Sequence, residues 1–121
     1  MGLDQFAYSV NREIPDVDFE ETEEGREEIM YWRKHPNLHG WMEQLYIDKG
    51  GKREFNCTPV KLTFTDLDRL FVDVAAGTLP HTTGFFFGQS QPEDFDNDMA
   101  FITRAKQAIK DGKSVYYSSW W

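Results

Sequence analysis

The stretch YWRKHPNLHGWM, residues 31–42, divides the first half of the chain into two predicted helices. Its proline, Pro36, pushes the preceding residue His35 out of helical backbone geometry. We therefore expect one helix over about residues 23–34 and a second that begins near Asn37, whose side chain can cap it. The second helix carries an apolar stripe at helical spacing, formed by Leu38, Trp41, Met42, Leu45 and Tyr46.

Glycines end this second helix and also raise a question inside it. Gly50 and Gly51 follow the last residue of the apolar stripe and are typical of a helix C-terminus. Gly40 lies within the helix, where glycine costs about 1 kcal/mol relative to alanine. Either another segment packs very close to Gly40, or the helix begins later in the sequence.

Two further helices are predicted in the second half of the chain. The first opens at Thr65 and closes at Gly77. The second follows a capping box formed by Ser90 and Glu93 and ends at Gly112. The predicted strands are residues 5–10, an interrupted strand over 53–57 and 60–64, the apolar run TGFFFG at 83–88, and 114–120.

These elements predict an α+β fold. We expect one two-layer domain over residues 1–121, with about four helices packed on a mostly antiparallel or mixed sheet of four to five strands. The chain has 121 residues, of which 16% are aromatic, so a single buried core is within its reach.

The net charge of −8 bears on the choice of partners. It disfavours direct binding to nucleic acid phosphates and to anionic membranes. The sequence has no run of about twenty apolar residues, so no membrane span is expected. Its one cysteine, Cys57, excludes an internal disulfide and favours a reducing cytoplasm.

The charge is unevenly distributed. Residues 16–28 hold eight acids and one arginine, and basic residues follow at 33–35. Acids near the start of a helix and bases near its end complement the helix macrodipole, which is why we predict a helix here. A second interpretation is that this acidic segment imitates nucleic acid and binds a basic host protein.

A cationic corner is expected where the two helices of the opening stretch meet. It gathers hydrogen-bonding and basic side chains beside a helix N-terminus, which favours anions. Its residues are Trp32, Arg33, Lys34, His35, Asn37 and His39. A small anionic, aromatic ligand would suit such a corner. The alternative is that these groups neutralise the acids of residues 16–28.

Other residues are candidates to complete that ligand site. Asn56, Thr82 and Thr83 could donate hydrogen bonds, although the threonines could equally form a simple turn. Tyr117 or Trp120 could stack on an aromatic ring. The terminal strand leaves more aromatic surface than one core face can cover, so a homo-oligomer is expected.

Metal binding and nucleophilic catalysis have less support in the sequence. His35, His39 and Glu43 are spaced four residues apart, but Pro36 interrupts the helix that would present them together. Cys57 lies in a strand-like segment, where a lone cysteine is typically inert. We expect no metal and no cofactor.

Much of the chain from Tyr31 onward resembles a family of small bacteriophage proteins. The resemblance rests on YWRKHPNLHGWM, FNC, LPHTTGFFFG and VYYSSWW. It implies a phage accessory protein in the host cytoplasm. It brings with it no mechanism, ligand or catalytic residue.

Three functions follow from these observations. The first is non-enzymatic sequestration of a small anionic, nucleotide-like ligand, which would counter host defence. The second is inhibition of a host protein through the acidic segment 16–28. The third is a small hydrolase or transferase that uses His35 or His39 as a general base.

Overall fold

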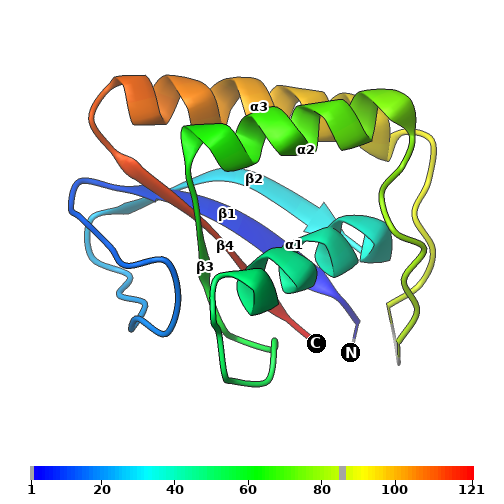
Figure 1. The fold of residues 1–121 in the computed structure, drawn as a ribbon, viewed down its shortest axis with the longest axis horizontal. Coiled ribbons are helices and arrows are strands. Elements are labelled where there is room, and N and C mark those ends of the chain that lie inside the picture. The colour runs from blue at the N-terminus through cyan, green and yellow to red at the C-terminus, as the bar shows by residue number, and fades with distance from the viewer. Residues whose placement is uncertain (1, 85–86) are drawn as a thin grey trace.

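The computed structural model describes residues 2–84 and 87–121, and in them three helices cover one face of a four-stranded sheet (Figure 1). The strand order is β2–β1–β4–β3, and every neighbouring pair is antiparallel. The predicted α+β class is confirmed, with one helix fewer than expected among the described residues. The elements are β1 (Asp4–Val10), β2 (Arg26–Arg33), α1 (Pro36–Asp48), β3 (Val60–Leu62), α2 (Phe64–Ala76), α3 (Asp94–Lys110) and β4 (Ser114–Trp120).

The segment predicted as a helix over about residues 23–34 forms strand β2 for most of its length, so that prediction is wrong. β2 pairs with β1 and places Tyr31 opposite Phe6. Trp32 is buried beneath the helices whereas Tyr31 is exposed on the opposite face, which is the alternation of a strand. The charge pattern that favoured a helix is a local signal, and pairing with a distant apolar strand outweighs it.

Helix α1 begins at Pro36 and buries the predicted apolar stripe. Asn37 lies inside its first turn and does not cap it; the Asn37 Oδ1 atom accepts a hydrogen bond from the Thr82 backbone N–H at 3.1 Å. The same close packing explains Gly40, because a Cβ atom at that position would overlap Thr82 Oγ1. The connection between α2 and α3 therefore packs directly on α1.

The other two helices begin with different caps from those predicted. α2 opens with a capping box of Thr63 and Asp66, slightly earlier in the sequence than expected. The N-cap of α3 is Glu93 and has no side-chain cap hydrogen bond, so the predicted Ser90–Glu93 capping box is wrong. The Ser90 hydroxyl oxygen instead accepts the Asn37 backbone N–H at 3.1 Å, at the start of α1.

The interrupted strand predicted over 53–57 and 60–64 is shorter in the structure. Residues 53–57 form bends and only Val60–Leu62 pairs with β4. Phe55 is nevertheless buried, and its ring stacks at 5.9 Å on that of Tyr117. The apolar character of 53–57 thus reflects contact with the core rather than sheet pairing.

The strand predicted over TGFFFG is also not found in the described part of that stretch, residues 83, 84, 87 and 88. Phe85 and Phe86 lie outside the described residues. Phe87 is buried, with its ring edge-on to His39 and to Trp121. Phe87 thus packs this connection against the core.

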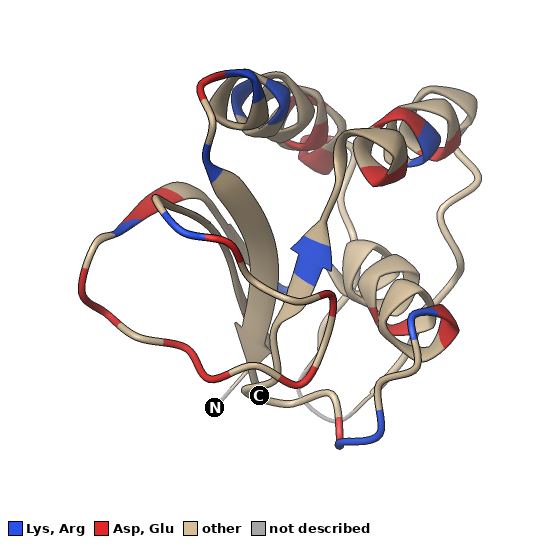
Figure 2. Cartoon of the chain, turned by 60° about the vertical axis from the view of Figure 1, so that its left-hand side comes forward, with Lys and Arg blue, Asp and Glu red and all other residues tan. Residues whose placement is uncertain are grey.

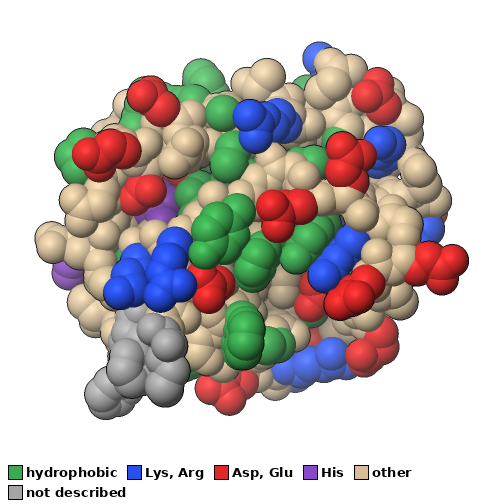
Figure 3. Space-filling view, turned by 180° about the vertical axis from the view of Figure 1, so that it is seen from behind, with side chains coloured by type: hydrophobic (Ala, Val, Ile, Leu, Met, Phe, Trp, Pro, Cys, Tyr) green, Lys and Arg blue, Asp and Glu red, His purple; other side chains and the backbone are tan. Residues whose placement is uncertain are grey.

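The sheet face opposite the helices is only partly covered. Ile14 and Phe19 from the β1–β2 connection pack on Tyr8 and Tyr116. Beyond them Trp120 is 65% exposed, and Figure 3 shows hydrophobic side chains between charged ones on this side of the molecule. No helix of the described residues has the length and apolar character of a membrane span.

Candidate functional site

The predicted cationic corner is divided by the fold. Lys34 has a positive φ of 57° and turns the chain from the end of β2 into α1. Arg33 and Lys34 remain exposed, and Arg33 lies 3.1 Å from the Asp4 carboxylate. His35 and His39 are buried, with 3% and 2% of their surfaces exposed. Two cations thus face the solvent, while the two imidazoles enter the interior.

His39 is enclosed by aromatic rings. Its Nδ1 atom lies 2.8 Å from the Tyr117 hydroxyl, which also accepts a hydrogen bond from Gln5 at 3.1 Å. Burial lowers the pKa of His39 to about 4 and raises that of Tyr117. His39 is therefore neutral at pH 7 and unsuited to hold an anion, and the buried Tyr117 ring has no surface for stacking on a ligand.

His35 belongs to a different network, which includes a carboxylate and a hydroxyl. Its Nε2 atom lies 2.9 Å from Asp98 Oδ2, and its Nδ1 atom lies 2.6 Å from Ser90 Oγ. The other Asp98 oxygen accepts the Trp32 indole N–H at 3.0 Å. Burial raises the pKa of Asp98, and the hydrogen bond from His35 opposes that effect.

The main chain of His35 is also fixed by hydrogen bonds, in addition to those of its ring. The Gln5 side chain accepts the His35 N–H at 2.8 Å and donates to its carbonyl oxygen at 3.0 Å. Gln5 is fully buried in β1. This two-point contact fixes the junction between β2 and α1, so the imidazole orientation is determined by backbone and side-chain contacts together.

A cavity of about 250 Å³ lies at the start of α1 and is called the α1 cavity below. Thr82 and Thr83, both predicted to contact a ligand, line it. Figure 1 shows why: the connection from α2 to α3 descends beside the end of α1 at which that helix begins. The described residues that line the cavity are Pro36, Asn37, His81, Thr82, Thr83, Gly88, Gln89 and Ser90.

The α1 cavity brings together two motifs that are far apart in the sequence. One is YWRKHPNLHGWM and the other is LPHTTGFFFG, which also carry the resemblance described above. Lys34 is not a lining residue, but its side chain packs beside Gly88, where a Cβ atom would lie 2.9 Å from Lys34 Cδ. Sequence analysis missed His81, Gln89 and Ser90 as lining residues, because only the packing of the connection on α1 places them there.

A second cavity, of about 320 Å³, adjoins the first through Asn37 and Ser90 and is called the Ser90 cavity below. Its floor includes His35 and Asp98, and Asp94 also lines it. Its apolar lining comes from Val74, Leu79 and Phe95, among others. No sequence signal distinguished Asp98 from the other aspartates at the start of α3.

The remaining predicted contacts lie outside these cavities. Asn56 forms two hydrogen bonds with the Trp121 backbone, at 2.7 and 3.0 Å, and so anchors the C-terminal residue. Trp120 projects from the sheet face opposite the helices. Trp32 is buried and donates to Asp98. Thr82 and Thr83 thus line the α1 cavity, His35 lines an adjoining cavity, and Lys34 packs beside the lining residue Gly88. Asn56, Tyr117 and Trp120 line neither cavity.

Comparison of the chain with family models, curated proteins and solved structures finds no match.

The acidic segment 16–28 follows the β1–β2 connection into β2, and acidic residues recur along that connection in Figure 2. Arg53 pairs with Asp18 and with Glu20, both at 3.6 Å. Within the described residues no ion pair joins this segment to Arg33 or Lys34. The exposed cations at the corner therefore do not neutralise these acids, and an inhibitory role for the segment stays a prediction.

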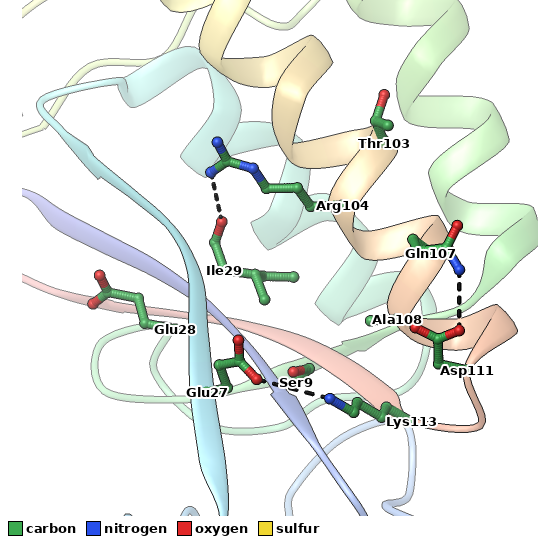
Figure 4. Close-up of a pocket in the computed structure, with 10 residues that line it drawn as sticks. All are labelled: Ser9, Glu27, Glu28, Ile29, Thr103, Arg104, Gln107, Ala108, Asp111 and Lys113. Carbon is green, nitrogen blue, oxygen red and sulfur yellow. Dashed lines mark hydrogen bonds and ion pairs between the residues drawn. The ribbon is translucent and has the colours of Figure 1, made fainter.

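The largest of the described cavities, about 590 Å³, lies between β2 and the C-terminal half of α3 (Figure 4). Its acids include Glu27, Glu28 and Asp111. Lys113 lies 3.7 Å from Glu27, and Arg104 donates to a backbone oxygen of β2. Its cations are thus already engaged, and acids on both walls disfavour an anionic ligand.

Metal binding has no geometric support in residues 2–84 and 87–121, which contain no group of three or more His, Cys, Asp or Glu side chains placed to hold an ion. Cys57 is exposed at its bend, and partial desolvation of its thiol raises the Cys57 pKa.

Proposed function

We propose that the protein binds a small ligand through an anionic group seated in the α1 cavity. The observation that carries this proposal is the absence of carboxylates among the described residues that line the cavity, in a chain with a net charge of −8. Among the described residues, four further cavities of about 230 to 590 Å³ each have at least one acidic lining residue. An anion entering the α1 cavity meets the least repulsion.

Helix α1 contributes a favourable electrostatic field at this position. Its first turn contains no acidic residue, so its N-terminal partial charge is not neutralised by a carboxylate of that turn. Such helix ends bind phosphates and carboxylates through their backbone N–H groups. At this helix end Pro36 has no N–H, the His39 N–H donates to the His35 carbonyl oxygen, and the Asn37 N–H donates to Ser90 Oγ, a hydroxyl that a ligand oxygen could replace.

Side chains supply the remaining donors. The Thr83 hydroxyl, the His81 imidazole and the Gln89 amide all line the α1 cavity, and each can donate a hydrogen bond to an anionic oxygen. The Lys34 side chain packs beside Gly88, which is one of the lining residues. This set provides one exposed cation and several neutral donors, which suits a single phosphate better than a polyphosphate.

The adjoining Ser90 cavity suggests what the anionic group is attached to. Val74, Leu79 and Phe95 offer apolar contact to a planar ring, and Asp94 can accept hydrogen bonds from ring amino groups. A ligand with a phosphate in the α1 cavity and a nucleobase in the Ser90 cavity is nucleotide-like. With the resemblance to phage proteins, this favours a phage accessory protein that withdraws such a ligand in an infected cell.

The test introduces a carboxylate into the α1 cavity. Thr83→Asp should weaken binding of adenosine monophosphate at least about tenfold in calorimetric titration, since like charges repel at short range. Thr103→Asp, on the exposed side of α3, adds the same charge elsewhere and should leave binding unchanged. Equal affinities for wild type and Thr83→Asp would refute the proposed site.

A further inference from the structure

We propose that Ser90 is a nucleophile activated by His35 and Asp98, and that the Ser90 cavity is a site of acyl-ester hydrolysis. The three side chains form one continuous hydrogen-bonded chain. Ser90 Oγ lies 2.6 Å from His35 Nδ1, and His35 Nε2 lies 2.9 Å from Asp98 Oδ2. Such an order of hydroxyl, imidazole and carboxylate is the arrangement that nucleophilic catalysis by serine requires.

The proton positions follow from the surrounding contacts. The proposal uses the neutral His35 tautomer with its proton on Nε2, which donates to the Asp98 carboxylate and leaves Nδ1 as the acceptor that faces Ser90. Ser90 Oγ already receives the Asn37 backbone N–H at 3.1 Å, which directs its own hydrogen toward His35 Nδ1. The imidazole thus faces the hydroxyl with the nitrogen that can accept a proton.

In this series of hydrogen bonds, His35 and Asp98 are buried, whereas Ser90 is accessible from the cavities. His35 and Asp98 are 3% and 1% exposed, and Trp32 holds the second Asp98 oxygen. Ser90 is only partly buried and lines both cavities. The general base and its carboxylate are therefore shielded from water, while the hydroxyl can contact a bound substrate.

The reaction can be written with each atom placed. Ser90 Oγ bonds to the carbonyl carbon of the ester as its proton moves to His35 Nδ1. The bond to the leaving alcohol then breaks, and that alcohol takes the proton from Nδ1. Water next attacks the acyl-serine, giving a proton to Nδ1 that returns to Ser90 Oγ as the carboxylic acid leaves.

Charge that develops during these steps has nearby stabilisation. The imidazolium keeps its Nε2 hydrogen bond to Asp98, and Asp94 Oδ2 lies 3.5 Å from Nδ1. Negative charge on the carbonyl oxygen develops beside the N-terminus of α1, which carries no acid in its first turn. We expect the ester substrate to carry an anionic group, which the α1 cavity would hold. This expectation rests on the proposed function, whereas the reactivity of Ser90 does not.

An uncharged alkyl fluorophosphonate tests this reactivity on the full chain. Ser90 Oγ should displace fluoride and form a stable phosphonyl ester, detected by intact mass and located by peptide mapping. Ser90→Ala should abolish the adduct, and His35→Gln and Asp98→Asn should slow it at least about 100-fold, since general-base assistance is lost. Ser118→Ala removes a buried serine from β4 and should label at the wild-type rate.

The outcomes separate the two proposals. Absence of an adduct on native wild-type protein, an adduct on another residue, or unchanged rates in the His35 variant would overturn the nucleophile, whatever the fate of ligand binding. Because the adduct is mapped on the wild type, the conclusion holds even if a variant fails to fold. Labelling of Ser90 that adenosine monophosphate does not slow would support the nucleophile and count against the α1 cavity as the anion site.

Discussion

His35 and His39 differ in their hydrogen-bond partners although they are four residues apart and almost equally buried. His39 contacts aromatic rings and a tyrosine hydroxyl, and burial keeps it neutral. His35 connects a carboxylate in the interior to a hydroxyl on a cavity wall. Burial alone therefore does not distinguish a histidine that only packs in the core from one that is placed to accept a proton. The partners of the two ring nitrogens make that distinction.

Removal of the Asp98 carboxylate, which bonds His35 but not His39, should cause the largest loss in the free energy of unfolding. Asp98→Ala leaves the His35 and Trp32 N–H groups without their acceptor in a buried site, at a cost of about 3 kcal/mol in the free energy of unfolding. Urea denaturation at pH 7 measures this loss. Asp96→Ala, on the same helix but exposed, should lose less than about 1 kcal/mol. Similar losses in both variants would contradict the network.

A smaller effect is expected from the titration of His39. Below pH 6.5 the unfolded chain gains a proton that the folded protein does not bind until about pH 4, so stability falls as the pH decreases through that window. The loss between pH 7 and pH 5 should be about 2 kcal/mol. His39→Phe should remove that part of the slope, whereas His81→Phe, at an exposed position, should retain it. Parallel slopes in all three proteins would show that His39 is not the group responsible.

The smallest effect is expected at the hydroxyl beside His39. Tyr117→Phe removes one acceptor from Gln5 and one partner from His39, which should cost about 1 kcal/mol in urea unfolding. Tyr31→Phe removes an exposed hydroxyl bonded to Asp4 and should cost less than about 0.5 kcal/mol. Fluorophosphonate labelling of Ser90 should not change in either variant. Slower labelling in Tyr117→Phe would mean that the two histidine networks are coupled.

The sequence predicted those parts of the fold that depend on local signals. The stripe of α1 has helical spacing and was recognisable from neighbours in the chain. The strand at 114–120 was also predicted, and six of its seven residues are buried. β2 was wrongly predicted as a helix because it forms a strand by pairing with the distant β1, which its own composition does not reveal. Gly40 was correctly singled out, since its cost requires a close neighbour, but Thr82 could not be named in advance.

The candidate site was predictable only in outline. The opening stretch indicated the start of α1, and Thr82 and Thr83, two of the predicted ligand contacts, line the cavity there. Its histidines were assigned to the anion, although both turn inward, because the left-handed backbone at Lys34 reorients the chain after β2. Ser90 was recognised as a capping residue but assigned to its own helix; its true partners are 53 and 55 residues away in the sequence.

The most direct measurement for the central claim is an NMR titration of ¹⁵N-labelled protein with adenosine monophosphate. The account predicts saturable shifts in the backbone amides around the α1 cavity, foremost Thr82, Thr83, Gln89 and Ser90. The amides of residues 16–28 should remain in place. Chemical-shift changes centred on that acidic segment or on the cavity between β2 and α3 would contradict ligand binding in the α1 cavity. The absence of changes at a high nucleotide concentration would contradict it equally.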